Sequence, residues 1–428
     1  MMKKRAIVSL VACGVIAASA TMGLTACKKD KGITVWGAQN QRAMLTEMIE
    51  EFKTQNPDIK LDITVGVCGE SDAYAQISKD VTASADVFGF ANDQLINLRK
   101  INALARLSTA NVDMIKQNND EGSVQAAQIK DAYYGYPYAS DNGYFMYYDK
   151  SVVKEESLGD LDKILDDCYA NKKFFIYNQR EAWYVGTFFF GAGGDYTLEW
   201  GGDKGMDLIK SQCNFDQKPA GSEYTYGQIG GTAHIELNKA SKVFVNGDDT
   251  VIGQYLNSGL VGACISGTWN AQIISEKLGA NYAATKMPKF HSTLTNEDYQ
   301  MTSFIGYKLY GVNPNSKHLE ESHKLAAFLS SKEMQEKRFD ALQTGPSNKE
   351  VAQLQKVKDN VALAAFAAQR NAPNGVKFQD ALPSSYWDAM KGFGEGVNGT
   401  SPTITEGNLS EKLQTLIQGL NKSTSEEA

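Results

Sequence analysis

The chain has few of the residues on which metal centres and disulfide scaffolds depend. It holds only four histidines, and its six cysteines lie far apart without a CxxC pair. Such spacing disfavours zinc and redox motifs, so we expect neither a metal nor another cofactor. Beyond Cys27 the thiols are Cys68, Cys168, Cys213 and Cys264. We expect these four thiols to be buried and free. One disulfide among them is the alternative, and the spacing does not select which pair would form it.

Motifs of nucleotide chemistry and serine catalysis are also missing. The sequence has no GxxxxGK[ST] and no GxSxG, so it gives no support for ATP hydrolysis or a serine nucleophile. The glycines from Gly394 to Gly399 fit a dinucleotide pattern. That pattern should follow a strand and open a helix, whereas this one follows a helical stretch and runs toward Pro402. A helix exit is the expected structure there.

Acidic residues outnumber basic ones, and three of the basic residues stand together at the start of the chain. Lys and Arg number 43 against 50 Asp and Glu, and removing Lys3, Lys4 and Arg5 leaves 40 against 50, a net charge near −10. This balance disfavours nucleic acid as a partner. After the N-terminal segment, no apolar run is long enough to span a bilayer.

The N-terminal segment has the order of a secretory signal. A basic start precedes an apolar stretch from Ala6 to Leu24, and small residues lead to Cys27. Leu24-Thr25-Ala26-Cys27 resembles a bacterial lipobox, in which the cysteine becomes the lipidated first residue. We therefore predict that residues 1–26 are a lipoprotein signal peptide and that Cys27 tethers the protein to the outer face of the cell membrane. A plain N-terminal membrane anchor is the alternative.

The remaining chain reads as an α/β protein. A strand is expected at Ile33–Trp36, a helix at Gln41–Phe52, an alternating strand at Ile59–Val65 and a buried strand at Ala85–Phe90. Strands that alternate with helices predict an open sheet with parallel neighbours. Further elements are extended chain over Tyr133–Tyr148, a strand over Thr302–Val312, a helical run over Leu319–Leu342, and a last helix with Leu409, Leu413, Leu416 and Leu420 on one face. The tail, residues 422–428, is expected to be disordered.

Several stretches, in this order, carry a resemblance to one known family. They are Ile33–Trp36 with the helix after it, Ala85–Asp93, Gly135–Ala139, Gly262–Trp269 and Ser303–Gly306. Together they resemble the maltose-binding-protein family of ABC-transporter solute-binding lipoproteins, over nearly the whole chain after Cys27.

The resemblance implies a periplasmic-binding-protein-like fold of two lobes, each an α/β sheet sandwich, with the ligand cleft between them. One lobe would hold residues 32–138 and 304–343, and the other would hold residues 143–302 and 347–420. Ligands of such folds bind at the carboxyl ends of the strands.

A sugar ligand also agrees with the residue types. A pyranose offers an apolar face to flat aromatic rings and hydroxyls to carboxylates and amides. Four tryptophans are expected at the ends of elements, whereas Trp200, beside Gly201 and Gly202, is expected to be a core residue. Matched to the family, the implied ligand-binding residues are Trp36, Gln39, Asn40, Phe90, Asp93, Gln94, Asp141, Glu181, Trp183, Tyr184, Trp269 and Trp387. For the three acidic residues Asp93, Asp141 and Glu181, a surface salt bridge is the alternative.

The predicted function is therefore that of an extracellular, non-catalytic binding protein. It would capture an oligosaccharide, with maltose or maltodextrins implied by the resemblance, and deliver it to the transmembrane subunits of an ABC permease. It would act as a lipid-anchored monomer. The alternatives are a binder of another oligosaccharide, a secreted glycoside hydrolase in which Asp141 and Glu181 would be the carboxylate pair, and a surface adhesin. The sequence gives neither the chain length of the sugar, nor the affinity, nor the permease.

Overall fold

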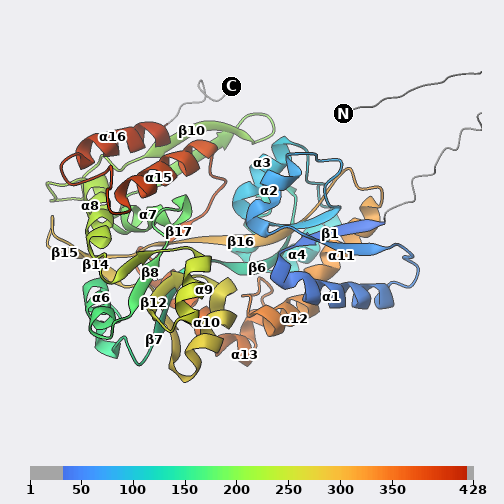
Figure 1. Ribbon diagram of the computed structural model, residues 1–428. Coiled ribbons are helices and arrows are strands. Elements are labelled where there is room, and N and C mark those ends of the chain that lie inside the picture. The colour runs from blue at the N-terminus through green and yellow to red at the C-terminus, as the bar shows by residue number, and fades with distance from the viewer. Residues whose placement is uncertain (1–31, 422–428) are drawn as a thin grey trace, which may run out of the picture. The chain divides into compact units, whose positions relative to one another are not determined.

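A computed structural model describes residues 32–421 (Figure 1). The predicted signal peptide, the predicted lipidation site Cys27 and the tail at residues 422–428 lie outside the described residues. Within them, no helix has both the length and the apolar character that crossing a membrane requires.

The first sheet has six strands in the order β17-β16-β3-β1-β2, with β6 also paired to β16. As predicted, β1 lies parallel to both β2 and β3. The predicted alternating strand is shorter than expected, because residues 59–62 precede β2 and only its later part pairs with β1. The bounds are β1 Ile33–Gly37, β2 Ile63–Val67, β3 Val87–Ala91, β6 Tyr136–Gly143, β16 Ser303–Val312 and β17 Val376–Phe378.

Helices α1, α2 and α11 pack on this sheet, and α12 contacts α1. Helix α1 buries Met44, Leu45, Met48, Ile49 and Phe52, as the helical spacing predicts. The predicted run over residues 319–342 is two helices, because the chain turns at Ser330 and the Ser331 hydroxyl caps α12 by accepting from the Met334 N–H. The bounds are α1 Arg42–Gln55, α2 Ala73–Ile77, α3 Leu95–Lys100, α4 Thr109–Asn118, α5 Glu121–Gln125, α11 Leu319–Leu329 and α12 Lys332–Leu342.

The second sheet has five strands in the order β11-β8-β12-β7-β13. Helices α6 and α9 pack against its central strands, and α14 packs against β7 and β13. The bounds are β7 Phe145–Asp149, β8 Phe174–Tyr177, β11 Phe244–Asn246, β12 Val261–Ser266, β13 Tyr282–Thr285, α6 Leu161–Ala170, α9 Asp249–Asn257, α10 Ala271–Leu278, α13 Gln355–Lys358 and α14 Val361–Asn371.

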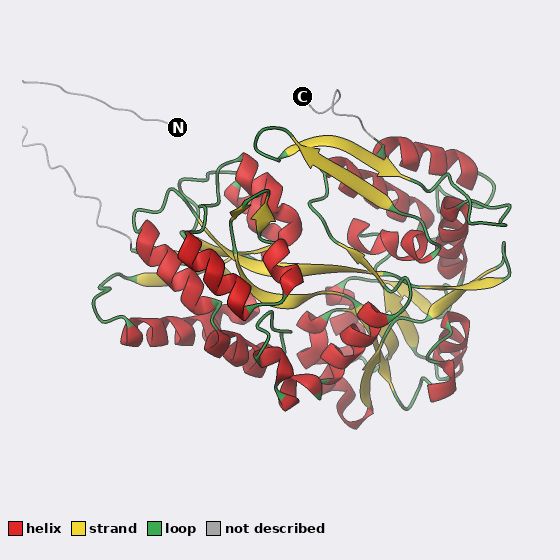
Figure 2. Ribbon diagram, turned by 180° about the vertical axis from the view of Figure 1, so that it is seen from behind, coloured by secondary structure: helices red, strands yellow, loops and turns green. Residues whose placement is uncertain are grey.

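A layer of four helices lies beside the second sheet (Figure 2). Its members are α7 Ala182–Gly191, α8 Tyr226–Lys239, α15 Ser384–Val397 and α16 Leu409–Leu420. The four leucines predicted on one face of α16 are all buried. Helix α15 ends at Val397, within the segment from Gly394 to Gly399, so the predicted helix exit is confirmed, with Gly394 and Gly396 in the last turn of the helix. A Cβ on Gly394 would lie 2.5 Å from the carbonyl oxygen of Gln179, so this glycine permits close packing.

The two sheets define two lobes, and the chain passes between them more than once. Strand β6 pairs in the first sheet and β7 in the second, with Tyr144 between them. The segment after α12 then returns to α14. Three short hairpins complete the strands, namely β4 Gln128–Ile129 with β5 Ala132–Tyr133, β9 Tyr196–Gly201 with β10 Asp207–Cys213, and β14 Lys289–Ser292 with β15 Glu297–Gln300.

Two segments that the sequence assigns to the second lobe contact the first. Strand β17 pairs with β16. The tip of the β9–β10 hairpin reaches α3 (Figure 1), where the Lys130 ammonium donates to the carbonyls of Gly202 and Asp203 at 2.6 and 3.0 Å. Trp200 packs half-buried against the core of the first lobe, with the Lys100 ammonium 5.4 Å from its ring. It is therefore part of a contact between lobes rather than of its own lobe's core.

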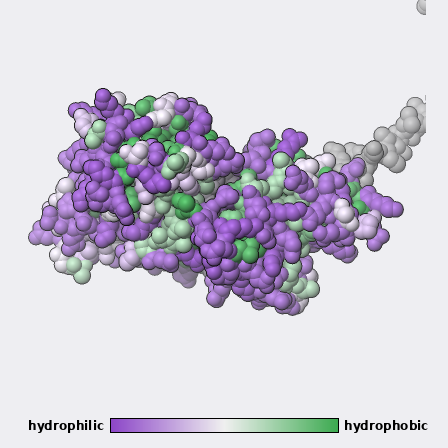
Figure 3. Space-filling model, turned by 90° about the horizontal axis from the view of Figure 1, so that it is seen from below, coloured by the Kyte–Doolittle hydropathy of each residue, from purple (hydrophilic) through white to green (hydrophobic). Residues whose placement is uncertain are grey.

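The core confirms the prediction for the thiols beyond Cys27. Cys68, Cys168, Cys213 and Cys264 are free and buried. His234 lies in α8 and is fully buried between aromatic rings. On the face in Figure 3, apolar residues are interspersed among hydrophilic ones.

Candidate functional site

Residues from both sheets meet beside the passages between the lobes. Strands β3 and β12 end there, and each runs into a short 3-10 turn, at Asn92–Gln94 and at Thr268–Asn270. The N-terminal turn of α7 and the residue after β17 also reach this place. We call Asp93, Asp141, Trp183, Trp269, Lys308 and Gln379 the junction cluster.

Two tryptophans form the aromatic part of the cluster. The rings of Trp183 and Trp269 lie 5.7 Å apart at an interplanar angle of 40°, and both side chains are half-buried. Trp183 contacts Tyr184 and Tyr144 edge-on, at 5.3 and 4.9 Å. These contacts fix the indole on one side and leave a partly exposed aromatic surface that an apolar face could cover.

Asp249, which the sequence analysis missed, orients Trp269. Its Oδ2 accepts from the Trp269 Nε1–H at 2.9 Å, and its Oδ1 accepts from the Asn270 amide at 2.7 Å. Desolvation by surrounding protein raises the pKa of Asp249, although these hydrogen bonds oppose the rise. Asp249 is the first residue of α9, where no local motif marks it.

Gln379, also missed, connects the two lobes through its side-chain amide and its backbone carbonyl. Its Oε1 accepts from the Trp183 Nε1–H at 2.9 Å, and its backbone carbonyl accepts from the Asn92 amide at 2.8 Å. The side chain is 3% exposed. Gln379 therefore links a ring of the second lobe to the turn that carries Asp93.

Asp93 has a carboxyl group that protein atoms only partly satisfy. Its Oδ1 is buried and has no hydrogen-bond partner among the described residues. Burial raises the pKa of Asp93 to about 7, while a hydrogen bond from Gln379 opposes the rise. A group of this kind gains from a ligand hydroxyl that donates to it.

Asp141 lies on β6 and has no exposed surface. Its Oδ2 accepts from the Thr268 hydroxyl and from the Gly345 N–H, both at 2.6 Å. Its Oδ1 lies 3.6 Å from the ammonium of Lys308, which projects from β16. Asp141 thus joins a turn of the second lobe to two passages of the chain.

The other predicted acid and its neighbour also lie near these rings. Glu181 caps α7 by accepting from the Trp183 N–H at 3.0 Å. Desolvation by neighbouring protein raises the pKa of Glu181 even though its side chain keeps contact with solvent. Tyr184 is buried at 8% exposure between Trp183 and Tyr144.

The side chains of six other predicted residues make no hydrogen bond or ring contact with the cluster among the described residues. Trp36 packs half-buried against the first lobe's core over Gly66, and Gln39 and Asn40 are exposed in the turn after β1. Phe90 is a core residue with no exposed surface, and both ends of the Gln94 amide hold the turn at residues 70–74. The sixth, Trp387, packs on the second lobe's core beside Tyr386.

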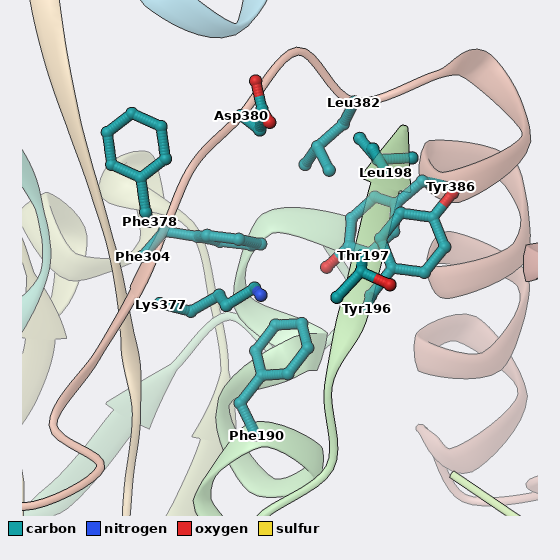
Figure 4. Close-up of a pocket in the computed structure, with 10 residues that line it drawn as sticks. All are labelled: Phe190, Tyr196, Thr197, Leu198, Phe304, Lys377, Phe378, Asp380, Leu382 and Tyr386. Atoms are coloured by element: carbon teal, nitrogen blue, oxygen red, sulfur yellow. The ribbon is translucent and has the colours of Figure 1, made fainter. Parts of the chain in front are cut away.

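A pocket of about 200 Å³ lies near the cluster, between β9, β17 and α15 (Figure 4). Phe190, Phe304 and Leu382 are among its walls. The Lys377 ammonium in it is paired with Asp195. No residue of the predicted set lines this pocket, so it carries no part of the predicted site.

The described residues contain no group of three or more His, Cys, Asp or Glu placed to hold a metal ion. The junction cluster instead combines partly exposed indole rings with carboxyl, amide and ammonium groups. Rings with an apolar face and a rim of hydroxyls match such a surface.

The comparisons with known proteins agree with this chemistry. Residues 47–365 match the family described as bacterial extracellular solute-binding protein. The galactooligosaccharide-binding protein of Bacillus subtilis (strain 168) is 22% identical over 389 residues, which cover 88% of this chain and 85% of that protein.

Solved structures show the same fold. One determined with acarbose is 30% identical, has a TM-score of 0.78, and covers 91% of this chain and 98% of its own. The maltodextrin-binding protein of L. casei BL23, solved without ligand, is 22% identical, has a TM-score of 0.72, and covers 91% of this chain and 99% of its own.

Proposed function

Because the chain belongs to the bacterial extracellular solute-binding family, we propose that it captures an oligosaccharide outside the cell for an ABC importer. The carrying observation is the Trp183–Trp269 pair, which is held by Gln379 and Asp249 and bordered by Asp93. Indole faces take up the apolar side of a sugar ring, and the polar neighbours serve its hydroxyls.

Maltodextrin is the proposed ligand, with a galactooligosaccharide as the second candidate. Three solved relatives of the same fold are maltodextrin-binding or maltotriose-binding proteins. The curated relative is a galactooligosaccharide binder. Both ligands offer several neutral rings in a row, and two adjacent indoles suit more than one ring.

The protein binds without catalysis in this proposal, by closing its lobes around the sugar. Gln379 and Asp141 already tie groups of one lobe to groups of the other. A ligand that touches both lobes favours the closed arrangement only by its differential affinity for it. Incubation with the bound sugar should therefore return it intact, whereas a glycoside hydrolase would cleave it.

The remaining parts of the proposal concern location. Cys27 is proposed to carry the lipid that holds the protein at the outer face of the membrane, as a monomer that meets the transmembrane subunits of its permease.

Of the predicted ligand residues, we propose that Asp93, Glu181, Trp183, Tyr184 and Trp269 form the contact surface, with Trp36, Gln39, Asn40 and Trp387 joining only if the lobes move.

Isothermal titration calorimetry with a panel of sugars tests the proposal. The panel contains maltose, maltotriose, maltotetraose, β-1,4-galactotriose, xylotriose and mannotriose. High-micromolar or tighter binding of the maltodextrins supports the glucan assignment. If only galactotriose binds, the ligand is a galactooligosaccharide and the proposed capture by lobe closure still holds. If none of the six sugars gives a binding signal, oligosaccharide capture is refuted.

A further inference from the structure

Asp141 is closed off from any ligand in this structure. The residue has no exposed surface, its Oδ2 already accepts two hydrogen bonds, and its Oδ1 is buried. A ligand hydroxyl would have to displace protein atoms to reach it. The family resemblance implies that Asp141 binds ligand directly, so the structure gives this carboxylate a different task.

Lys308 is the group beside it that a ligand can reach. Its side chain is 14% exposed, and its ammonium makes no hydrogen bond within residues 32–421, the Asp141 oxygen being 3.6 Å away. The ammonium also lies 5.8 Å from the centre of the Trp269 ring. An ammonium has three N–H donors, and at this place they border the indole on which a sugar ring is proposed to stack.

Two carboxylates from different parts of the fold act on Lys308, Asp141 at 3.6 Å and Glu70 through its charge alone. Glu70 follows β2 and is buried at 9% exposure. Glu70 Oε1 accepts from the Tyr138 hydroxyl at 2.5 Å and from the Gln41 amide at 2.6 Å. Burial works against the charged form of Glu70, yet the Lys308 ammonium and these hydrogen bonds hold its pKa below the usual range. Asp141 is therefore the carboxylate close enough to position the ammonium.

We propose that Lys308 donates hydrogen bonds to sugar hydroxyls beside the ring stacked on Trp269, and that Asp141 is the positioning residue that aims it. The inference rests on the proposed function, because it names a contact in the same site. It also narrows the ligand class. The positive charge of Lys308 is already balanced by two carboxylates, and Asp93, Glu181 and Asp249 stand nearby, so the site favours neutral sugars over uronate-bearing ones.

A double-mutant cycle read by calorimetry with maltotriose tests the assignment, with β-1,4-galactotriose used instead if it is the sugar that binds. The variants are Lys308→Met, Asp141→Asn and the double variant. Lys154→Met is the matched control, since Lys154 also serves a buried carboxylate, Asp167 at 2.9 Å, far from the cluster in the second lobe. Melting temperatures without sugar check that each variant folds.

We expect Lys308→Met to weaken binding at least tenfold and Lys154→Met to leave it within twofold. If Asp141 acts through Lys308, then Asp141→Asn adds less than twofold in the Lys308→Met background. If the double variant instead loses affinity by the product of the two single-variant factors, Asp141 acts on the sugar independently of Lys308, and its positioning role is overturned. Unchanged binding by a folded Lys308→Met variant would overturn this inference alone, whereas an unaltered protein that binds no sugar would refute the proposed function and the inference with it.

Discussion

The raised pKa of Asp93 makes a quantitative prediction about stability and pH. Burial raises this pKa from 3.8 to about 7, so the folded protein holds the proton more tightly than the unfolded chain does. The favourable contribution is therefore complete below pH 3.8 and is lost as the pH rises through 7. Each pH unit in that window is worth about 1.4 kcal/mol, which gives an upper limit of about 4 kcal/mol, since water entering near a partly exposed carboxylate reduces the cost.

Asp93→Asn removes the titration and keeps the shape of the side chain. We expect its free energy of unfolding to match that of the unaltered protein within about 1 kcal/mol at pH 4.5, and to exceed it by about 2–4 kcal/mol at pH 8.5. Urea denaturation at the two pH values measures the difference. A difference between the two proteins that is equal at both pH values would refute the reasoning, because it would mean that Asp93 titrates normally in the folded state.

Sugar binding should report on the same proton. Hydroxyls that donate to the carboxylate lower its pKa, so at pH 6.5 binding should release protons. The calorimetric enthalpy should then depend on the ionisation enthalpy of the buffer. Asp93→Asn should abolish this dependence on the buffer. If the variant keeps the same dependence, a group other than Asp93 releases the proton on binding.

Further predictions concern four other features. Trp269→Ala should weaken sugar binding by about 1–3 kcal/mol in calorimetry with little change in the melting temperature of the free protein, and an unfolded variant would make Trp269 a core residue. His234, whose pKa burial lowers to about 4, should cost up to about 3 kcal/mol of stability as the pH falls from 6.5 to 4; His234→Gln should flatten that loss in urea titrations, and an unchanged slope would contradict it. Cys27→Ala should release the protein from membranes in cell fractionation without harming its fold, and a processed variant that stays membrane-bound would reject the lipobox. Sugar should shrink the protein in small-angle scattering and raise its melting temperature, and an unchanged radius would argue against closure.

Sequence patterns predicted the fold where local periodicity carries the information. The spacing of Met44 to Phe52 and of the four leucines in α16 follows the helix period, and both sets are buried. The break at Ser330 and Ser331 was not predicted, because serine in a helical run is common and only the cap geometry ends α11 there.

The sequence led to the two tryptophans of the junction cluster and, through the family resemblance, to Asp93 and Asp141, but not to Lys308 or Gln379. Trp183 and Trp269 could be predicted from their residue type and from their positions at the ends of expected elements. Lys308 and Gln379 are single polar residues in or beside strands, and their roles arise from neighbours more than 150 residues away, such as Asp141 and Trp183. Phe90 illustrates the opposite error, since an aromatic at a family position is a core residue here.

Calorimetric titration of the purified protein with maltotriose and β-1,4-galactotriose tests the central claim most directly. The account predicts saturable binding of at least one of them, with one sugar per chain, a dissociation constant in the high-micromolar range or tighter, and recovery of the intact trisaccharide. Failure of a folded protein to bind any oligosaccharide of the panel, or cleavage of the sugar during the titration, would contradict it.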